Sequence, residues 1–228
     1  MSDIKIYNQD NMKFQTDELF DVIFCDYIYE NLDFSWVDHY YPMLKPNGIF
    51  IGMTDYHSAA EFKVYTQNNM KAYLANWLTW KNEFGNFPKD RFRQCHDDII
   101  IFSKTEKFKF YPERAQVEKA TAGSKGLNPS GRTTKLATSV ILDCCLTTTA
   151  KERVKKLDGH LLRWQKPQSL YDRIFFPLTD EGDKCLDPFM GSGAFGKWCK
   201  KNNRDYVGIE YDSEVYGYAS DNIFGKGE

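Results

Sequence analysis

The stretch Lys184–Glu210, KCLDPFMGSGAFGKWCKKNNRDYVGIE, decides the fold class of this 228-residue chain. A short apolar run is followed by a glycine-rich turn, a predicted helix over 194–201 and a predicted strand over 206–209. Glycines at such a turn let the backbone pass close to a ligand, and the free N–H groups of the next helix point at it. Glu210 ends the second strand, where an acidic residue suits a pair of ribose hydroxyls. The stretch therefore predicts a nucleotide-type site.

The glycine pattern alone fits a dinucleotide site as well. Gly191-Ser192-Gly193-Ala194-Phe195-Gly196 satisfies G-x-G-x-x-G, and Glu210 follows Gly191 after 19 residues. Only 18 residues of this sequence follow Glu210, which leaves no room for the remaining strands of a two-half dinucleotide fold. A nicotinamide-dependent oxidoreductase is therefore the lesser alternative.

Composition indicates a single soluble domain over residues 1–228. Hydrophobic residues make up 42% and charged residues 27% of the chain, both ordinary values for a globular protein. The six cysteines show no C-x-x-C spacing, so neither a metal site nor a disulfide framework is predicted. No apolar run approaches 18 residues, so we expect no membrane segment and a cytoplasmic location.

Basic residues gather in the middle of the chain. Residues 104–166 hold 14 Lys and Arg against six Asp and Glu, whereas the whole chain has a net charge of −2. Such a segment is typical of a patch that binds a polyanion. A solvated loop rich in lysine is the alternative.

The remaining elements predict a three-layer α/β fold. Strands are expected over 4–7, 21–25 and 49–53, helices over 30–43, 58–74 and 169–176, and a turn over 45–48. Strands over 77–80 and 98–102 follow each other without a helix, which predicts an antiparallel hairpin at one edge of the sheet. A mostly parallel sheet covered by helices on both faces follows from this order.

Several motifs resemble those of one family. Asp187-Pro188-Phe189-Met190-Gly191-Ser192-Gly193 resembles the D-P-F-x-G-S-G cofactor motif of amino-group DNA methyltransferases. Trp80-Lys81, Arg91-Phe92-Arg93 and Gln165-Lys166-Pro167 match other parts of the family's pattern, and the resemblance spans nearly the whole chain. The motif order is similar to the circularly permuted beta class, in which the catalytic motif precedes the cofactor motif. The resemblance implies a Rossmann-like, S-adenosylmethionine-dependent methyltransferase fold.

The resemblance also implies site residues. Asp26 would hold the amino group of the target base, and Tyr29 would stack on that base after it leaves the helix. The expected partner is DNA, with 104–158 as the candidate recognition insert; the reaction needs no metal. The cofactor S-adenosylmethionine would lie against Asp10, Asp187, Phe189, Gly191, Ser192, Gly193 and Glu210, and the DNA against Arg114, Lys125, Arg132, Lys135 and Arg153.

The catalytic turn departs from the family pattern. The family carries D-P-P-Y, and here the tetrapeptide is Asp26-Tyr27-Ile28-Tyr29. The prolines fix φ and aim a backbone carbonyl, and a misplacement of about 1 Å can cost roughly 10²-fold in rate. Two functions therefore stay open. One is methylation of adenine N6 in DNA, which the aspartate favours over cytosine N4; the other is a degenerate homologue that binds DNA or a partner. A homodimer or a partner subunit also stays open.

Overall fold

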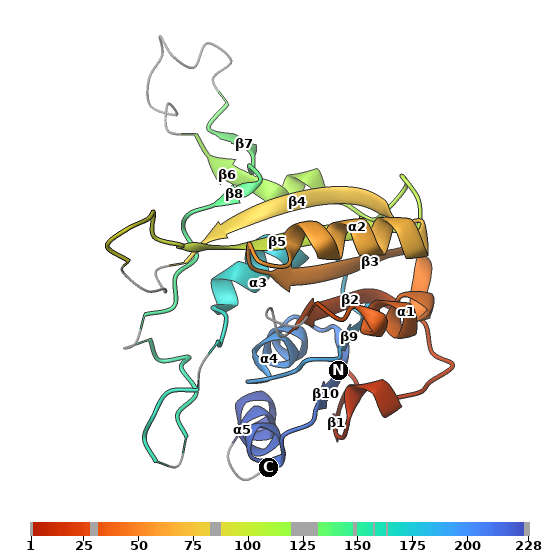
Figure 1. The fold of residues 1–228 in the computed structure, drawn as a ribbon, viewed down its shortest axis with the longest axis vertical. Coiled ribbons are helices and arrows are strands. Elements are labelled where there is room, and N and C mark those ends of the chain that lie inside the picture. The colour runs from red at the N-terminus through yellow and green to blue at the C-terminus, as the bar shows by residue number, and fades with distance from the viewer. Residues whose placement is uncertain are drawn as a thin grey trace.

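One eight-stranded sheet forms the centre of the protein (Figure 1). The computed structural model describes residues 2–27, 32–82, 88–119, 132–147, 150–156, 158–162 and 164–225. The strand order is β1-β10-β9-β2-β3-β5-β4-β8, and the first five strands are parallel. The strands are β1 (Ile4–Asn8), β2 (Phe20–Asp26), β3 (Leu44–Thr54), β4 (Tyr73–Lys81), β5 (His96–Ser103), β8 (Val140–Ile141), β9 (Lys184–Asp187) and β10 (Asp205–Glu210).

Helices cover both faces of this sheet, because successive residues of the buried strands point to opposite sides. Phe24 packs with the aromatic side chains of α3 and α4, whereas its neighbours Ile23 and Cys25 belong to a second cluster with α1 and α2. The expected three-layer α/β class is therefore confirmed. The helices are α1 (Ser35–Tyr40), α2 (Ala59–Met70), α3 (Gln168–Phe175), α4 (Ala194–Lys201) and α5 (Ser213–Phe224).

The strand that carries the glycine turn lies inside the sheet although it comes late in the chain. β9 pairs with β10 on one side and with β2 on the other, so Leu186 lies opposite Ile23. The ends of β2 and β9 are therefore adjacent, with Asp26 on one strand and Asp187 on the other. Ligands of open α/β sheets bind at such carboxyl ends.

Three local predictions were wrong in their bounds. The helix expected over 58–74 ends at Met70, because Lys71 adopts a left-handed conformation (φ 53°) and Tyr73 begins β4. Within the described part of 30–43, only Ser35–Tyr40 is α-helical, and a 3-10 turn over Tyr41–Met43 follows. The turn expected at 45–48 lies inside β3, where the pairing with β2 shifts between Phe20 and Val22.

The basic insert contains short strands. β6 (Gln116–Glu118) and β7 (Thr134–Leu136) pair antiparallel in a separate two-stranded sheet, which projects from the body in Figure 1. β8 then pairs with β4 at Thr79 and Trp80, so the predicted hairpin of β4 and β5 is present but β8 lies outside it. From β8 the chain runs to α3 along the side toward which the arrows of β3 and β4 point.

Candidate active site

The carboxyl ends of the parallel strands bring the catalytic candidate Asp26 and several cofactor candidates to one edge of the sheet, which we call the carboxyl edge. Asp26 ends β2, Asp187 ends β9 and Glu210 ends β10, while Asp10 follows β1 by two residues. The sequence separates Asp26 from Asp187 widely, and the parallel pairing of β2 with β9 closes that gap. The sheet topology thus supports one shared site.

The glycine turn between β9 and α4 needs its glycines at two positions. Gly191 and Gly193 have positive φ of 53° and 69°, a conformation that costs other residues free energy. A Cβ on Gly193 would also lie 2.9 Å from Cδ1 of Ile223 and 3.0 Å from the carbonyl oxygen of Ala219. The turn therefore approaches α5 closely and leads into α4 at Ala194, as predicted.

The Glu210 carboxylate is tied to this turn. Its Oε2 accepts a hydrogen bond from the N–H of Gly191 at 2.9 Å, and its Oε1 accepts one from the N–H of Asp212 at 2.9 Å. Burial raises the pKa of Glu210, while these N–H groups act in the opposite direction. A carboxylate has about four lone-pair positions, so Glu210 can hold the turn and still accept from ribose hydroxyls.

Asp187, at the end of β9, stabilises the start of the turn through its side-chain hydrogen bonds. Its side chain is buried, Oδ1 accepts from the N–H of Phe189 at 3.2 Å, and Oδ2 accepts from the hydroxyl of Tyr206 at 3.0 Å. Burial raises the pKa of Asp187 to about 8. Ser192 is also buried, whereas Phe189 is half-buried with its ring 5.4 Å from that of Trp36.

An open groove lies beside Glu210. It has a volume of about 470 Å³ and is formed where β1 and β10 end. Asp10 accepts from the N–H of Met12 at 3.0 Å and remains partly exposed, so its carboxylate lines the groove. The lining residues are Asn8, Gln9, Asp10, Tyr211, Asp212 and Ser213.

The catalytic candidate Asp26 has a basic partner that the sequence reading did not assign. Nζ of Lys166 lies 2.7 Å from Oδ2 of Asp26, and the side chains are 5% and 20% exposed. Lys166 also donates to the carbonyl of Trp164 at 3.2 Å. Trp164 is exposed and has a positive φ of 64°, which is uncommon for a bulky residue. Gln165-Lys166-Pro167 was recognised as a motif, but its contact with Asp26 has no local signal.

The carboxylate of Asp97, which the sequence did not predict, interacts electrostatically with the Asp26–Lys166 pair. Burial raises the pKa of Asp97 to about 6; the charge of Asp26 also raises it and that of Lys166 lowers it. Asp97 lies on β5 beside Asp98, which pairs with Thr54 at the carboxyl end of β3. Tyr29, the predicted stacking residue, lies outside the described residues, as does Lys125.

The other predicted DNA contacts fall in different places. Arg132 and Lys135 are exposed at and beside β7. Arg153 donates to the carbonyls of Thr147 and Leu146, each at 3.3 Å. Arg114 pairs with Asp180 at 2.8 Å, next to the start of β9 and therefore at the opposite edge from Asp26. Arg114 and Arg153 are thus engaged in contacts within the fold.

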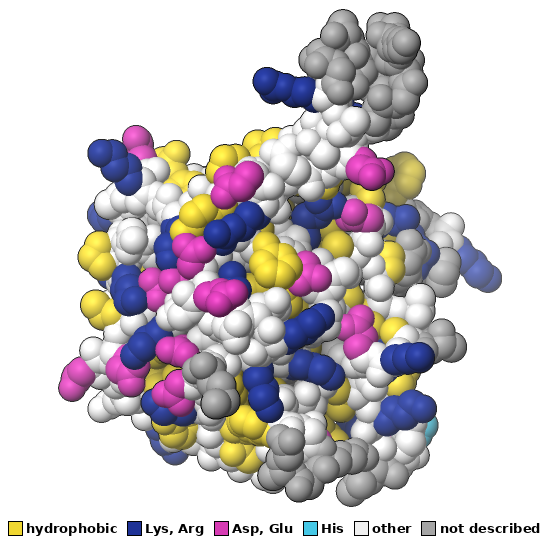
Figure 2. All heavy atoms as spheres, turned by 180° about the vertical axis from the view of Figure 1, so that it is seen from behind, with side chains coloured by type: hydrophobic (Ala, Val, Ile, Leu, Met, Phe, Trp, Pro, Cys, Tyr) yellow, Lys and Arg dark blue, Asp and Glu magenta, His cyan; other side chains and the backbone are white. Residues whose placement is uncertain are grey.

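The surface charge is uneven. Figure 2 views the molecule from behind, so the carboxyl edge lies toward its right-hand side. The lower right of that view carries mainly Lys and Arg side chains, whereas the left carries most of the Asp and Glu side chains with Lys and Arg among them. This distribution suits a polyanion at the carboxyl edge.

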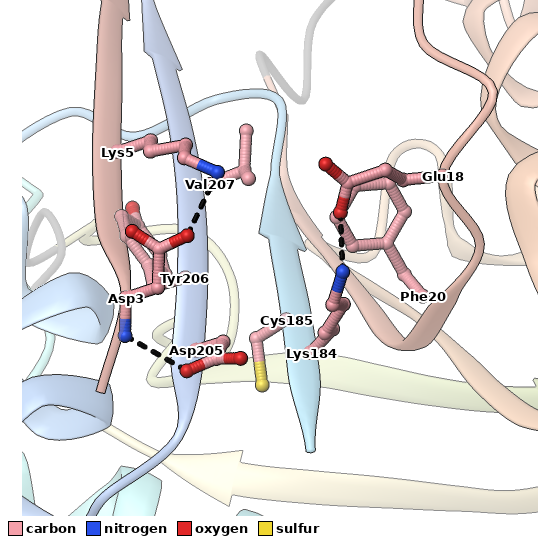
Figure 3. A pocket seen from close by; sticks show the side chains of 9 residues that line it. All are labelled: Asp3, Lys5, Glu18, Phe20, Lys184, Cys185, Asp205, Tyr206 and Val207. Carbon is pink, nitrogen blue, oxygen red and sulfur yellow. Dashed lines mark hydrogen bonds and ion pairs between the residues drawn. The ribbon is translucent and has the colours of Figure 1, made fainter. Parts of the chain in front are cut away.

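A small cavity at the opposite edge is flanked by two exposed ion pairs (Figure 3). Its volume is about 20 Å³, room for about one water molecule. Lys5 pairs with Asp3 at 2.7 Å and Lys184 with Glu18 at 2.5 Å. The cavity is structural and distant from the carboxyl edge; it is lined by Asp3, Lys5, Glu18, Phe20, Lys184, Cys185, Asp205, Tyr206 and Val207.

Neither a metal-binding cluster nor a membrane-spanning helix is found in the part of the chain that the structure describes. The described residues contain no cluster of three His, Cys, Asp or Glu side chains that could hold a metal ion. None of the helices within the described ranges is long and apolar enough to cross a bilayer. The six cysteines are all free.

The fold defines a Rossmann-like α/β protein, and its candidate site lies at the carboxyl edge of the sheet. The DNA methylase family N6_N4_Mtase matches residues 6–221, and the chain belongs to this family. Membership supports S-adenosylmethionine as the cofactor.

Individual relatives agree with this assignment. The type II methyltransferase M.HpaI of Haemophilus parainfluenzae is 31% identical over 202 residues, which are 84% of this chain and 59% of that protein. The chain spans about half the length of the curated relatives it matches.

Solved structures share the fold. The M1.HpyAVI–SAM complex superposes with a TM-score of 0.71 at 23% identity, covering 97% of this chain and 99% of that one. The PvuII DNA methyltransferase, described as cytosine-N4-specific, gives 0.75 at 15% identity, covering 100% of this chain and 89% of that one. Their similarity confirms the Rossmann-like methyltransferase fold.

Proposed function

We propose that this chain transfers the methyl group of S-adenosylmethionine to an exocyclic amino group of a base in DNA, with adenine N6 as the target. One observation carries the proposal: the Asp26 carboxylate ends the strand next to the one that ends in the glycine turn. A methyl acceptor held by Asp26 would therefore lie beside a cofactor held by the turn. Membership of the DNA methylase family supports the same reaction.

The cofactor would be held by the groove and the glycine turn together. Glu210 is suited to the ribose hydroxyls, and Asp10 lines the neighbouring groove, where an adenine would fit. Gly191 and Gly193 would let the backbone approach the methionine part. S-adenosylmethionine supplies an electrophilic methyl group on a positively charged sulfur.

Asp26 would orient the nucleophile. Its carboxylate accepts a hydrogen bond from the target N–H₂ group, so the nitrogen lone pair points at the methyl group. The nitrogen would form a bond to the methyl carbon as the carbon–sulfur bond breaks, which leaves the sulfur as a neutral thioether, and the nitrogen would then release one proton to water. Tyr29 is proposed to stack on the extruded base, as the family pattern implies.

DNA would approach the carboxyl edge. Arg132 and Lys135 are exposed and would contact phosphates, which fix position without reading sequence. Between β7 and β8 the chain returns to the end of β4, so these cations lie on the insert that leads to the site. Lys125 is proposed by its place in the same insert.

Cytosine N4 is the nearest alternative target, and the fold similarity to a cytosine-N4-specific enzyme keeps it open. A non-catalytic role is the second alternative. The pairing of Asp26 with Lys166 is the observation that favours it, because the lysine occupies Oδ2, one of the two carboxylate oxygens that the amino group could use. The permuted motif order and the homodimer or partner subunit remain expectations from the sequence.

The test is calorimetric titration with S-adenosylmethionine, followed by transfer of a radiolabelled methyl group to unmodified mixed-sequence DNA. We expect both binding and transfer, and N6-methyladenine in the digested product. N4-methylcytosine instead would identify the other target, and binding without transfer would favour the non-catalytic role.

The variant D26N should lose transfer. The matched control D21N alters the aspartate at the other end of β2, which pairs with Lys45 at 2.8 Å, and should keep transfer.

A further inference from the structure

Tyr27 occupies the position after Asp26 where the family pattern has its first proline. Its side chain is 4% exposed and turns into the core. The ring lies 5.0 Å from that of Trp36, 5.5 Å from Phe62 and 6.0 Å from Phe34. These rings come from α1, α2 and the segment before α1, so one side chain ties the end of β2 to three parts of the chain.

The hydroxyl group of Tyr27 is held as firmly as its ring. It donates to Oγ1 of Thr54 at 2.8 Å and lies 3.1 Å from Oγ of Ser58, and those two oxygens are 2.6 Å apart. Thr54 and Ser58 are fully buried. Burial raises the pKa of Tyr27 to about 12, so the phenol remains a donor at neutral pH.

This hydrogen-bonded group spans the neighbouring strand. Thr54 ends β3, the strand that pairs with β2 so that Met53 lies opposite Asp26. Ser58 directly precedes α2. The residue after the catalytic aspartate is thus fixed to the adjacent strand and to the start of the next helix.

We propose that Tyr27 is a positioning residue: its side chain fixes the position directly after Asp26, in place of the backbone restraint that proline supplies in the family pattern. Proline restricts φ through its ring and needs no partner. Tyrosine leaves φ unrestricted, but a buried ring and a buried hydrogen bond fix the residue through tertiary contacts. The catalytic consequence rests on the proposed methyltransferase function; the anchoring itself does not.

Three variants separate this role from general core packing. Y27F removes the hydroxyl and keeps the ring, T54V removes the acceptor with little change of volume, and T54S retains it. Y41F is the matched control. Tyr41 is equally buried in the same aromatic cluster and donates to the carbonyl of Ser103 at 3.1 Å, away from the turn.

The first measurement is amide hydrogen exchange over Cys25–Tyr27, which needs no activity. We expect Y27F and T54V to accelerate exchange there by about tenfold or more, and T54S and Y41F to leave it near the wild-type value. Unchanged exchange in Y27F and T54V would overturn the proposal. An equal acceleration in Y41F would overturn it too, because the effect would then belong to the whole cluster.

The second measurement is the single-turnover rate of methyl transfer together with the dissociation constant of S-adenosylmethionine. We expect Y27F and T54V to lower the rate by roughly 10- to 100-fold with cofactor affinity within about twofold of wild type. T54S, which retains the acceptor hydroxyl, should keep the wild-type rate. A wild-type rate in Y27F would refute the positioning role while the proposed function stands. A wild-type protein that transfers no methyl group would refute the function. The hydrogen-exchange data would still decide whether the Tyr27 side chain fixes the position after Asp26.

Discussion

Nζ of Lys166 lies 2.7 Å from Oδ2 of Asp26, although 140 residues separate them in the chain. The contact joins the segment before α3 to the end of β2, so the candidate catalytic carboxylate is held by the cofactor half of the chain. A carboxylate can accept from more than one donor, and a target amino group could therefore share Asp26 with Lys166. The pair also offsets the cost of burying either charge alone.

A double-mutant cycle tests this pair. K166M and D26N should each lower the free energy of unfolding by about 1–3 kcal/mol, because each leaves a poorly solvated partner. The double variant should lose less than the sum, with a coupling of about 1–3 kcal/mol in chemical denaturation. The control pair Lys45–Asp21 lies at the other end of β2 and is more exposed at its lysine, so its coupling should stay below about 1 kcal/mol. Strict additivity of K166M and D26N would contradict the assigned ion pair.

Local signals predicted the parts of the fold that depend on short stretches. The helix over 194–201 begins and ends as expected, because Gly193 precedes it and Asn202 follows as its cap. The strands over 21–25 and 49–53 were confirmed as well, because continuous apolar runs are typical of buried parallel strands. By contrast α5, which Asp212 caps through the N–H groups of Glu214 and Val215, was not predicted.

The candidate site was predictable only in part, because several of its contacts are between distant residues. The carboxyl-edge positions of Asp26 and Glu210 follow from strand ends, which the sequence marks. The partners of Lys166, Arg114 and Arg153 do not follow, because an ion pair or a main-chain hydrogen bond across the fold leaves no periodic pattern. The basic count over 104–166 therefore overstated how many cations are available to a polyanion.

The pH dependence of stability gives a second prediction. The pKa of Asp187 is raised to about 8 in the folded chain, from an ordinary value of 3.8. Between these values the folded state binds more protons than the unfolded state, so stability falls as pH rises. D187N keeps an acceptor for the N–H of Phe189 but cannot ionise. From pH 5 to pH 8 the free energy of unfolding of D187N should rise relative to that of the wild type by at most ~1.4 kcal/mol per pH unit. Thermal melting curves at several pH values measure this difference. Parallel curves would show that Asp187 does not titrate in this range.

DNA binding gives a third prediction. R132A combined with K135A should weaken binding to mixed-sequence DNA and reduce the slope of log K against log salt by about 1–2, because each phosphate contact releases about one counterion. R114A is the matched control, since Arg114 pairs with Asp180 at the opposite edge. It should leave affinity and slope near wild type in a fluorescence anisotropy titration. A larger loss of affinity in R114A than in the double variant would indicate that DNA binds at the opposite edge.

Two glycines in contrasting surroundings give the last prediction. G193A forces a side chain into left-handed φ and to within 2.9 Å of Ile223, so the turn or α5 must move. We expect a loss of stability above about 1 kcal/mol and a cofactor dissociation constant raised by tenfold or more in calorimetry. G217A lies inside α5, where a Cβ meets nothing within 4 Å, and alanine there should stabilise the protein by about 0.5–1 kcal/mol. Its cofactor affinity should stay unchanged. The opposite signs of the two stability changes would tie the loss in G193A to the geometry of the turn, whereas cofactor binding that survives G193A would separate the turn from the cofactor site.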